Sequence, residues 1–203
     1  MAPADSSGIT GVVLAGGLGR RMGRVDKGLQ DLRGKPLVQW VIERFVPQVD
    51  ELLINANANL ETYARFGYRV IPDAIDGFAG PLAGLQRGMS EARHDRIATV
   101  PCDSPFLPHD LVSRLSSALE QHGADLAVAK TGEQPHPVFC LCRKRLLPGL
   151  TAFLGGGGRK IDAWYATLRA VEVSFDHDAA AFSNINTREE LRTFETGAPD
   201  DQR

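Results

Sequence analysis

The sequence predicts an α/β protein of three layers, in which a mostly parallel, mixed central sheet lies between two layers of helices. Short apolar runs alternate along the chain with longer segments whose apolar side chains recur at helical spacing, the pattern of βαβ units. The runs are continuously apolar, which suits strands that are buried on both faces of a parallel sheet. Glycines and polar residues follow the runs directly, where such sheets bind their ligands.

The expected strands are the apolar runs bounded by glycine, proline or polar residues. They cover residues 9–15, 51–55, 68–72, 96–101, 125–129, 137–142 and 171–175. The expected helices begin after Pro36 and near Pro81, cover residues 109–122, 146–154 and 161–168, and end with one from Thr187 to about Glu195. Pro36 suits the first position of a helix. Thr187 and Glu190 form a capping box that opens the last helix.

One domain is expected over residues 1–203, with an ordered core over about residues 9–196 and frayed ends. The net charge of −2 argues against a nucleic-acid coat or a polybasic membrane binder. No apolar run reaches the roughly 18 residues that span a bilayer, and three cysteines cannot all pair. We therefore expect a cytoplasmic protein with buried thiols, and neither nucleic acid nor a membrane as its partner.

A glycine-rich, basic segment, residues 14–28, begins where the first apolar run ends. It fails the dinucleotide fingerprint, because Met22 stands at the third glycine, and it lacks the Gly-Lys-Ser/Thr of a P-loop. Glycines let backbone N–H groups approach a ligand, Arg20 and Arg21 add forked donors, and Lys27 adds a point charge. The segment predicts a polyphosphate site. The alternative is a surface loop whose basic side chains are merely solvated.

Three polar side chains stand at the ends of later expected strands. They are Asn55, Asp73 and Asp103. Because ligands of α/β sheets bind outside the carboxyl ends of the strands, these residues are expected to line the same site as the glycine-rich segment. Asp103 is the expected ligand of a divalent cation. The alternative role for Asp103 is an Asx turn before Ser104, and the two roles are compatible.

A set of short motifs follows one another in a characteristic order. They are Leu14-Ala15-Gly16-Gly17, Arg20-Arg21-Met22-Gly23, Asp26-Lys27, Gly34-Lys35-Pro36-Leu37, Asn55-Ala56-Asn57, Ile71-Pro72-Asp73, Gly80-Pro81-Leu82-Ala83-Gly84, Cys102-Asp103-Ser104-Pro105, His136-Pro137 and Asn184-Ile185-Asn186-Thr187. On these motifs the chain resembles nucleotidyltransferases over about residues 9–196, and among them the molybdenum cofactor guanylyltransferases of the MobA type. The opening Leu-Ala-Gly-Gly matches that family, whereas cytidylyl and sugar-phosphate relatives more often carry Leu-Ala-Ala-Gly.

The resemblance implies a Rossmann-like nucleotidyltransferase fold and a reaction. GMP would pass from GTP to the terminal phosphate of Mo-molybdopterin, giving molybdopterin guanine dinucleotide and pyrophosphate, with Mg²⁺ required and Mn²⁺ as a substitute. GTP and molybdopterin would be the substrates, cofactor-insertion proteins and molybdoenzymes would be transient partners, and a monomer is expected. The alternatives are a cytidylyl- or sugar-phosphate transferase on the same fold and a catalytically silent nucleotide-binding regulator.

The resemblance also assigns roles to individual residues. The GTP-binding set is Leu14, Ala15, Gly16, Gly17, Lys27, Asn55, Asp73, Gly84 and Asp103. Lys27, Arg21 and Asp103 are the expected catalytic residues, with Asp103 as the metal ligand. The N-terminal part of the chain would thus bind the nucleotide and the C-terminal part the acceptor.

Four residues of the C-terminal third are expected on the acceptor side. Arg159 and Lys160 follow the glycine run 155–158 and could contact a phosphorylated pterin, although a plain surface loop would look the same. Asn184 and Asn186 resemble the family's Asn-x-Asn-Thr element, and one of them could instead cap the helix that follows.

Other residues in the C-terminal half are of types that often bind ligands or catalyse reactions. For each of them we expect a structural role instead. Trp164 and Tyr165 could stack on a pterin, but aromatic residues at helical spacing belong more often to a core. His136 precedes a proline and is expected to be structural. Cys140 and Cys142 form C-x-C and not the C-x-x-C of a redox pair, and no second metal-ligand pair accompanies them. Buried thiols are therefore the simpler expectation.

Overall fold

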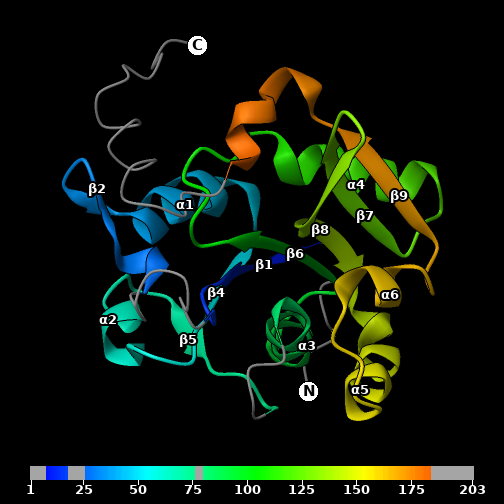
Figure 1. Ribbon diagram of the computed structural model, residues 1–203, viewed down its shortest axis with the longest axis horizontal. Helices are drawn as coiled ribbons and strands as arrows, with labels where there is room; N and C mark the ends of the chain where they lie inside the picture. The colour runs from blue at the N-terminus through cyan, green and yellow to red at the C-terminus, as the bar shows by residue number, and fades with distance from the viewer. Residues whose placement is uncertain (1–7, 18–25, 76–79, 184–203) are drawn as a thin grey trace.

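A seven-stranded sheet forms the middle layer of the computed structural model, which describes residues 8–17, 26–75 and 80–183 (Figure 1). The strands are β1 (Ile9–Leu14), β4 (Glu51–Asn55), β5 (Arg69–Ile71), β6 (Arg96–Pro101), β7 (Leu126–Thr131), β8 (Gln134–Arg143) and β9 (Ala170–Ser174). Their order is β5-β4-β1-β6-β8-β7-β9, and only β8 runs antiparallel to its neighbours. The expected mixed, mostly parallel sheet is confirmed.

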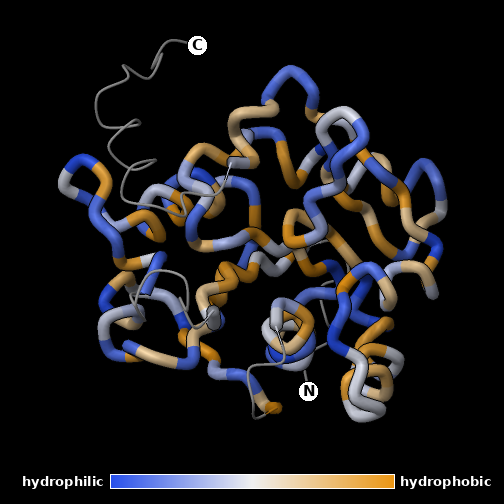
Figure 2. Tube along the Cα trace, in the orientation of Figure 1, coloured by the Kyte–Doolittle hydropathy of each residue, from blue (hydrophilic) through white to orange (hydrophobic). Residues whose placement is uncertain are grey.

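Helices cover both faces of the sheet (Figure 1). One layer holds α1 (Leu37–Phe45), α2 (Leu60–Ala64) and α4 (Leu111–Gln121), and the other holds α3 (Pro81–Glu91), α5 (Leu147–Gly155) and α6 (Ile161–Tyr165). Neighbouring residues of one strand pack into the hydrophobic cores on opposite faces of the sheet, because successive side chains of a strand point to opposite faces. In β1, Val13 packs with the first layer and Val12 with the second. Hydrophobic stretches accordingly run along the central strands in Figure 2.

The element boundaries agree with the sequence pattern to within three residues, and among the strands β8 differs most, since it begins at Gln134 and not at residue 137. Strands β4 and β6 have the expected bounds, and α6 ends at Tyr165, three residues before the expected end at residue 168. Pro36 lies one position before the first helical residue of α1 and ends a strand, instead of opening the helix. The expected helix from Thr187 lies outside the described residues.

Several short elements were not expected. They are β2 (Asp31–Leu32), β3 (Lys35–Pro36), α2, and the 3-10 turns η2 (Lys27–Leu29), η3 (Val46–Gln48), η4 (Lys144–Leu146) and η5 (Asp176–Phe182). Segments of two to seven residues are too short to show a hydrophobic period. Among the residues described, no helix is long and apolar enough to cross a membrane. The three cysteines are buried free thiols, as expected.

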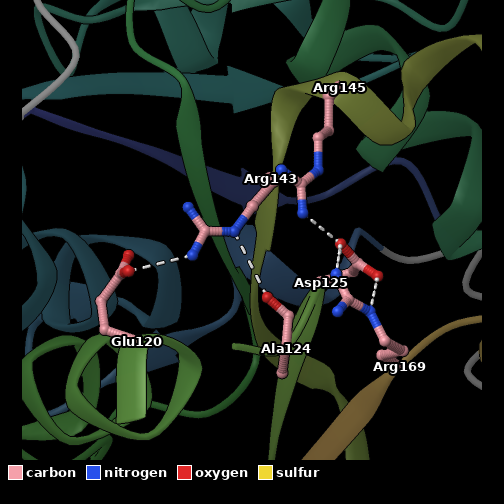
Figure 3. Close-up of polar contacts among 6 residues, drawn as sticks. All are labelled: Glu120, Ala124, Asp125, Arg143, Arg145 and Arg169. Carbon is pink, nitrogen blue, oxygen red and sulfur yellow. Dashed lines mark hydrogen bonds and ion pairs between the residues drawn. The ribbon is translucent and has the colours of Figure 1, made fainter. Parts of the chain in front are cut away.

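Asp125 joins three strands at the edge of the sheet where β6 and β7 begin (Figure 3). Its carboxylate accepts hydrogen bonds from Arg145 at 2.5 Å and from Arg169 at 3.0 Å. Its backbone carbonyl accepts the N–H of Arg143 at 3.2 Å, and Arg143 pairs with Glu120 of α4 at 3.0 Å. One carboxylate therefore ties the start of β7 to the end of β8 and to the start of β9.

We expect Asp125→Asn to lower the free energy of unfolding by about 1 kcal/mol at pH 7. Hydrogen bonds from Arg169 and Arg145 lower the pKa of Asp125 from 3.8 to about 2. That shift corresponds to about 2.4 kcal/mol, and solvent screening reduces it because the arginine side chains are 70% and 60% exposed.

The sign of the pH dependence follows from the lowered pKa. The stabilisation is complete above the unfolded-state pKa of Asp125 and is lost as the pH falls through its folded-state pKa, which is about 2. Urea denaturation of the parent and of the Asp125→Asn variant should give a stability difference at pH 7 that shrinks as the pH falls toward 2. A difference that is the same at both pH values would contradict this account.

Candidate active site

The glycine turn after β1 and the acidic turn after β6 leave the sheet side by side. In the strand register Leu14 lies between Asn55 of β4 and Pro101 of β6. The N–H of Cys102 donates to the carbonyl of Leu14 at 3.1 Å, and the N–H of Ala15 donates to the carbonyl of Asn55 at 2.8 Å. The carboxyl ends of β4, β1 and β6 thus form one continuous edge, where parallel sheets bind ligands.

Lys27 and Asp103 meet at this edge. The Nζ of Lys27 lies 3.2 Å from the Oδ2 of Asp103 and donates a hydrogen bond to it. Asp103 is only 7% exposed, whereas the side chain of Lys27 is 28% exposed. Burying an unpaired carboxylate would be costly, so the ammonium supplies its compensating charge. The pair places one positive and one negative group where a triphosphate and its cation would lie.

Asp103 is suited to share a cation with phosphate oxygens. Among the described residues, no three His, Cys, Asp or Glu side chains gather closely enough to hold a metal by themselves. Mg²⁺ commonly binds one or two carboxylates and takes its other ligands from phosphates and water. The ammonium of Lys27 already shows that Oδ2 of Asp103 accepts a cation. Burial and the neighbouring Asp103 raise the pKa of Cys102, so this thiol is protonated beside the carboxylate.

A second polar cluster links β4 to the loop after β5. The side-chain amide of Asn55 donates to Oδ1 of Asp73, and that of Asn57 donates to Oδ2, both at 2.8 Å. Asn57 Oδ1 accepts the N–H of Asp73 at 2.8 Å, and its amide also reaches the carbonyl of Gly16 at 3.4 Å. Asp73 is therefore held at both oxygens, and its carboxylate is oriented beside the glycine turn.

Gly84 lets α3 approach this cluster. A Cβ on Gly84 would lie 2.3 Å from Oδ1 of Asn55 and 2.8 Å from Cδ2 of Leu14, closer than atoms can pack. A Cβ on Gly16 would lie 2.9 Å from Nδ2 of Asn57. Glycine is therefore required at both positions by close approach rather than by backbone conformation. All but one of the expected GTP-binding residues thus gather around one edge of the sheet: Leu14, Ala15, Gly16, Lys27, Asn55, Asp73, Gly84 and Asp103. The remaining one, Gly17, follows Gly16 and is exposed.

The expected acceptor residues are placed less fully. Arg159 donates to the carbonyls of Leu154 at 2.8 Å and Gly158 at 2.6 Å, so its guanidinium caps the end of α5. The glycine run closes that helix, with Gly157 at a φ of +85°. Lys160 is exposed and precedes α6. An acceptor role for Arg159 and Lys160 stays a prediction. Arg21, Asn184 and Asn186 lie outside the described residues.

The aromatic residues of the C-terminal half serve the core. Trp164 is 2% exposed, and the hydroxyl of Tyr165 donates to the carbonyl of Pro137 at 2.7 Å. His136 stacks on Phe182 with ring centroids 4.7 Å apart. Burial lowers the pKa of His136, which keeps its ring neutral near pH 7. A structural part for these residues agrees with the expectation from the sequence.

The structure adds residues to the site that the sequence reasoning gave no role. Asn57 and Asp26 stand inside the quoted motifs, yet only the folded chain brings Asn57 against Asp73 and the segment around α2 against Asp26. Tyr63 and Asn59 belong to the unexpected segment around α2 and contact Asp26. The sequence does contain a signal for Asn57 as a site residue, because it is a second asparagine two positions after Asn55. Tyr63 and Asn59 had none.

Comparison with known proteins assigns the chain to a family. Residues 11–171 match the model of the MobA-like NTP transferase domain. The chain belongs to this family. A molybdenum cofactor guanylyltransferase of Cupriavidus necator is 53% identical over 193 residues, which cover 93% of this chain and 96% of the relative. The MobA-like fold is thus matched along almost the whole of both chains.

Solved structures support the same assignment. Molybdopterin-guanine dinucleotide biosynthesis protein A of Archaeoglobus fulgidus is 25% identical, covers 92% of this chain and 96% of its own, and superposes with a TM-score of 0.77. A Mycobacterium tuberculosis protein in complex with manganese shares the fold at 16% identity, with a TM-score of 0.67 over 95% of this chain and 100% of its own. The MobA-like chain described here is therefore a nucleotidyltransferase with a three-layer α/β/α fold.

Proposed function

We propose that this chain is a molybdenum cofactor guanylyltransferase. It transfers GMP from GTP to the terminal phosphate of Mo-molybdopterin and releases pyrophosphate, leaving molybdopterin guanine dinucleotide. The observation that carries the proposal is the meeting of Lys27 and Asp103, 3.2 Å apart, beside the glycine turn of β1. The names of the relatives, 53% identical in Cupriavidus necator, supply guanine and molybdopterin as the substrate classes.

Nucleotidyl transfer needs alignment and charge neutralisation more than covalent help from the protein. An oxygen of the acceptor phosphate forms a bond to the α-phosphorus of GTP, and the bond from that phosphorus to the bridging oxygen breaks, with its electron pair leaving on pyrophosphate. Lys27 stabilises the charge that develops on the α-phosphate. Gly16 and Gly17 offer backbone N–H groups to the phosphates, while Asn55, Asp73 and the start of α3 around Gly84 hold the nucleoside.

Divalent metal fits the donor set of the edge. Asp103 would hold Mg²⁺, with Mn²⁺ as a substitute, together with phosphate oxygens, and the bound ion masks the charge of the leaving pyrophosphate. The manganese complex of a protein with this fold supports a divalent cation in the fold. Arg21 would add a second positive group to the triphosphate, as the motif resemblance implies.

The acceptor would bind to the C-terminal part of a single domain spanning residues 1–203. Arg159, Lys160, Asn184 and Asn186 are its proposed contacts, and Lys160 offers an exposed cation to a phosphate. The protein would act as a cytoplasmic monomer that meets cofactor-insertion proteins and molybdoenzymes transiently.

Pyrophosphate release with GTP, CTP or UTP, each with molybdopterin as the acceptor, tests the proposed function. We expect turnover with GTP in the presence of Mg²⁺ or Mn²⁺ and clearly lower kcat/KM for CTP and UTP. A preference for CTP would replace the guanylyl assignment by a cytidylyl one. GTP binding without any turnover would instead favour a nucleotide-binding regulator.

A further inference from the structure

The turn that carries Lys27 is held by a carboxylate of its own. Asp26 directly precedes this 3-10 turn, and both of its oxygens accept hydrogen bonds from the segment around α2. Oδ1 accepts from the hydroxyl of Tyr63 at 2.7 Å, and Oδ2 accepts from the amide of Asn59 at 3.0 Å. Attachment at two points restrains the rotation of the carboxylate as well as its position, so the backbone beside Lys27 is fixed.

Tyr63 is a permanent donor to this carboxylate. Its side chain is 0% exposed and belongs to the core on the side of the sheet that α1, α2 and α4 cover. Burial, followed by the nearby Cys102 and Asp26, raises the pKa of the phenol far above the physiological range. The hydroxyl therefore keeps its proton in the physiological range, where it donates to Asp26.

Gly28 brings the same turn against the turn after β6, which carries Asp103. A Cβ on Gly28 would lie 2.6 Å from the hydroxyl oxygen of Tyr63 and 3.1 Å from the Sγ of Cys102. Cys102 immediately precedes Asp103 and is hydrogen-bonded to β1 through its N–H. The lysine turn is thus packed on Tyr63 and Cys102 at once, and its place relative to Asp103 follows from that packing.

Asn59 makes its contact from a strained backbone. Its φ of +52° and ψ of +33° lie in the left-handed region, which only a few residues besides glycine visit. From there its amide reaches Asp26 at 3.0 Å, and its carbonyl accepts the N–H of Tyr63 at 3.0 Å. The residue before α2 and Tyr63 of α2 therefore each present one donor to Asp26.

We infer that Asp26, held by Tyr63 and Asn59, is a positioning residue that keeps the ammonium of Lys27 at Asp103 and within reach of the triphosphate. The inference rests on the proposed function, which makes Lys27 a phosphate contact. None of the three acts on the substrate itself. Their effect on the reaction passes through Lys27, so it disappears when that lysine is removed.

Kinetics of two minimal variants test the inference. Tyr63→Phe removes one hydroxyl, and Asn59→Gly removes one amide while glycine keeps the left-handed backbone without strain. Each should lower kcat by roughly 3- to 10-fold, the equivalent of one hydrogen bond, and change the KM for GTP by less than about twofold. In a Lys27→Ala background neither should lower kcat further. An equal fall in both backgrounds would overturn the inference.

Chemical labelling of the ligand-free protein tests the positioning role of Asp26 without a measurement of catalysis. Acylation of lysine amines by acetic anhydride, followed by mass spectrometry, compares Lys27 with Lys35 in the same molecule. Tyr63→Phe and Asn59→Gly should each speed the labelling of Lys27 by roughly threefold or more, because the released ammonium leaves Asp103 more often. Unchanged labelling in both variants would overturn the inference. A parent without GTP turnover would refute the proposed function, and the labelling would still decide this point.

Two matched controls separate positioning from loss of stability. Tyr165→Phe also removes a buried phenol donor, to the carbonyl of Pro137 at 2.7 Å, but on the other face of the sheet. Arg33→Gly also replaces a left-handed residue, with a φ of +56°, in the β2–β3 turn. Both should keep parental kcat and parental labelling of Lys27. A fall in kcat for Tyr165→Phe as large as for Tyr63→Phe would mean that general stability, not positioning, controls the rate.

Asp26 could instead be a direct metal ligand, and an Asp26→Asn variant distinguishes the two roles. Positioning predicts a lowered kcat with the Mg²⁺ concentration for half-maximal activity unchanged, since both oxygens of Asp26 are already engaged. A kcat that recovers when the Mg²⁺ concentration is raised would assign Asp26 to the metal and overturn the inference.

Discussion

Asp103→Asn should lower kcat by at least about 10³-fold while the protein folds normally. The substitution keeps the size of the side chain and removes its charge, so the edge loses its expected metal ligand. Charge stabilisation by a bound cation is worth several kcal/mol in the transition state, and about 4 kcal/mol corresponds to 10³-fold. Stability should change by less than about 1 kcal/mol, because the partner Lys27 is partly exposed and a pair of this kind contributes little.

Pyrophosphate release over a Mg²⁺ titration measures the effect, and urea denaturation checks the fold. Asp110→Asn is the matched control, since Asp110 is an exposed acid that pairs with Arg114 one helical turn on. This control should keep parental kcat and Mg²⁺ dependence. If Asp103→Asn kept turnover near that of the parent, Asp103 would not hold the metal, and a structural turn would be its main role.

Lys27→Ala should lower kcat by roughly 10²- to 10³-fold, the usual consequence of removing one preorganised contact to developing charge. The KM for GTP should change much less than kcat, because the lysine acts most strongly on the transition state. Steady-state rates with GTP and molybdopterin measure both constants. Lys27→Arg keeps the positive charge but replaces the compact ammonium by a guanidinium. Its kcat should lie between that of the parent and that of Lys27→Ala.

Lys35→Ala is the control for the loss of a lysine. Lys35 lies on the exposed β2–β3 hairpin, where it pairs with Glu43 at 2.9 Å and lies over the ring of Trp40 at 4.6 Å. The variant should keep parental kcat. A rise in the KM for GTP with unchanged kcat in Lys27→Ala would show that Lys27 binds the ground state only, and would remove it from the catalytic residues.

Much of the active-site edge was predictable because strand ends are visible in a sequence. Cys102 and Asp103 directly follow the apolar run 96–101, and Asn55 is the last residue of the run 51–55. In a parallel sheet these ends lie at one edge, so the sequence predicts that Asp103 and Asn55 lie near the glycine turn. The structure places both beside Leu14, through the pairing of β1 with β4 and β6.

The support of the site was not predictable in the same way. Tyr63 belongs to a five-residue helix with no periodic signal, and a buried tyrosine is ordinarily a core residue. Its hydrogen bond to Asp26 spans 37 positions in the chain. Asn57 belongs to one of the sequence motifs, but its hydrogen bond to Asp73 depends on how β4 lies beside β5. Such contacts follow from side-chain direction and strand order, which local sequence does not contain.

The amino-acid order alone determined the α/β class, the strand ends that carry polar residues and the family resemblance, because burial periodicity and short motifs are local properties. Tertiary packing decided which of those residues touch. It set Lys27 against Asp103 across 76 positions and enclosed the lysine turn between Tyr63 and Cys102. Contacts between distant positions form only when strands pair and helices dock, so a chemical role that depends on distance required the folded chain.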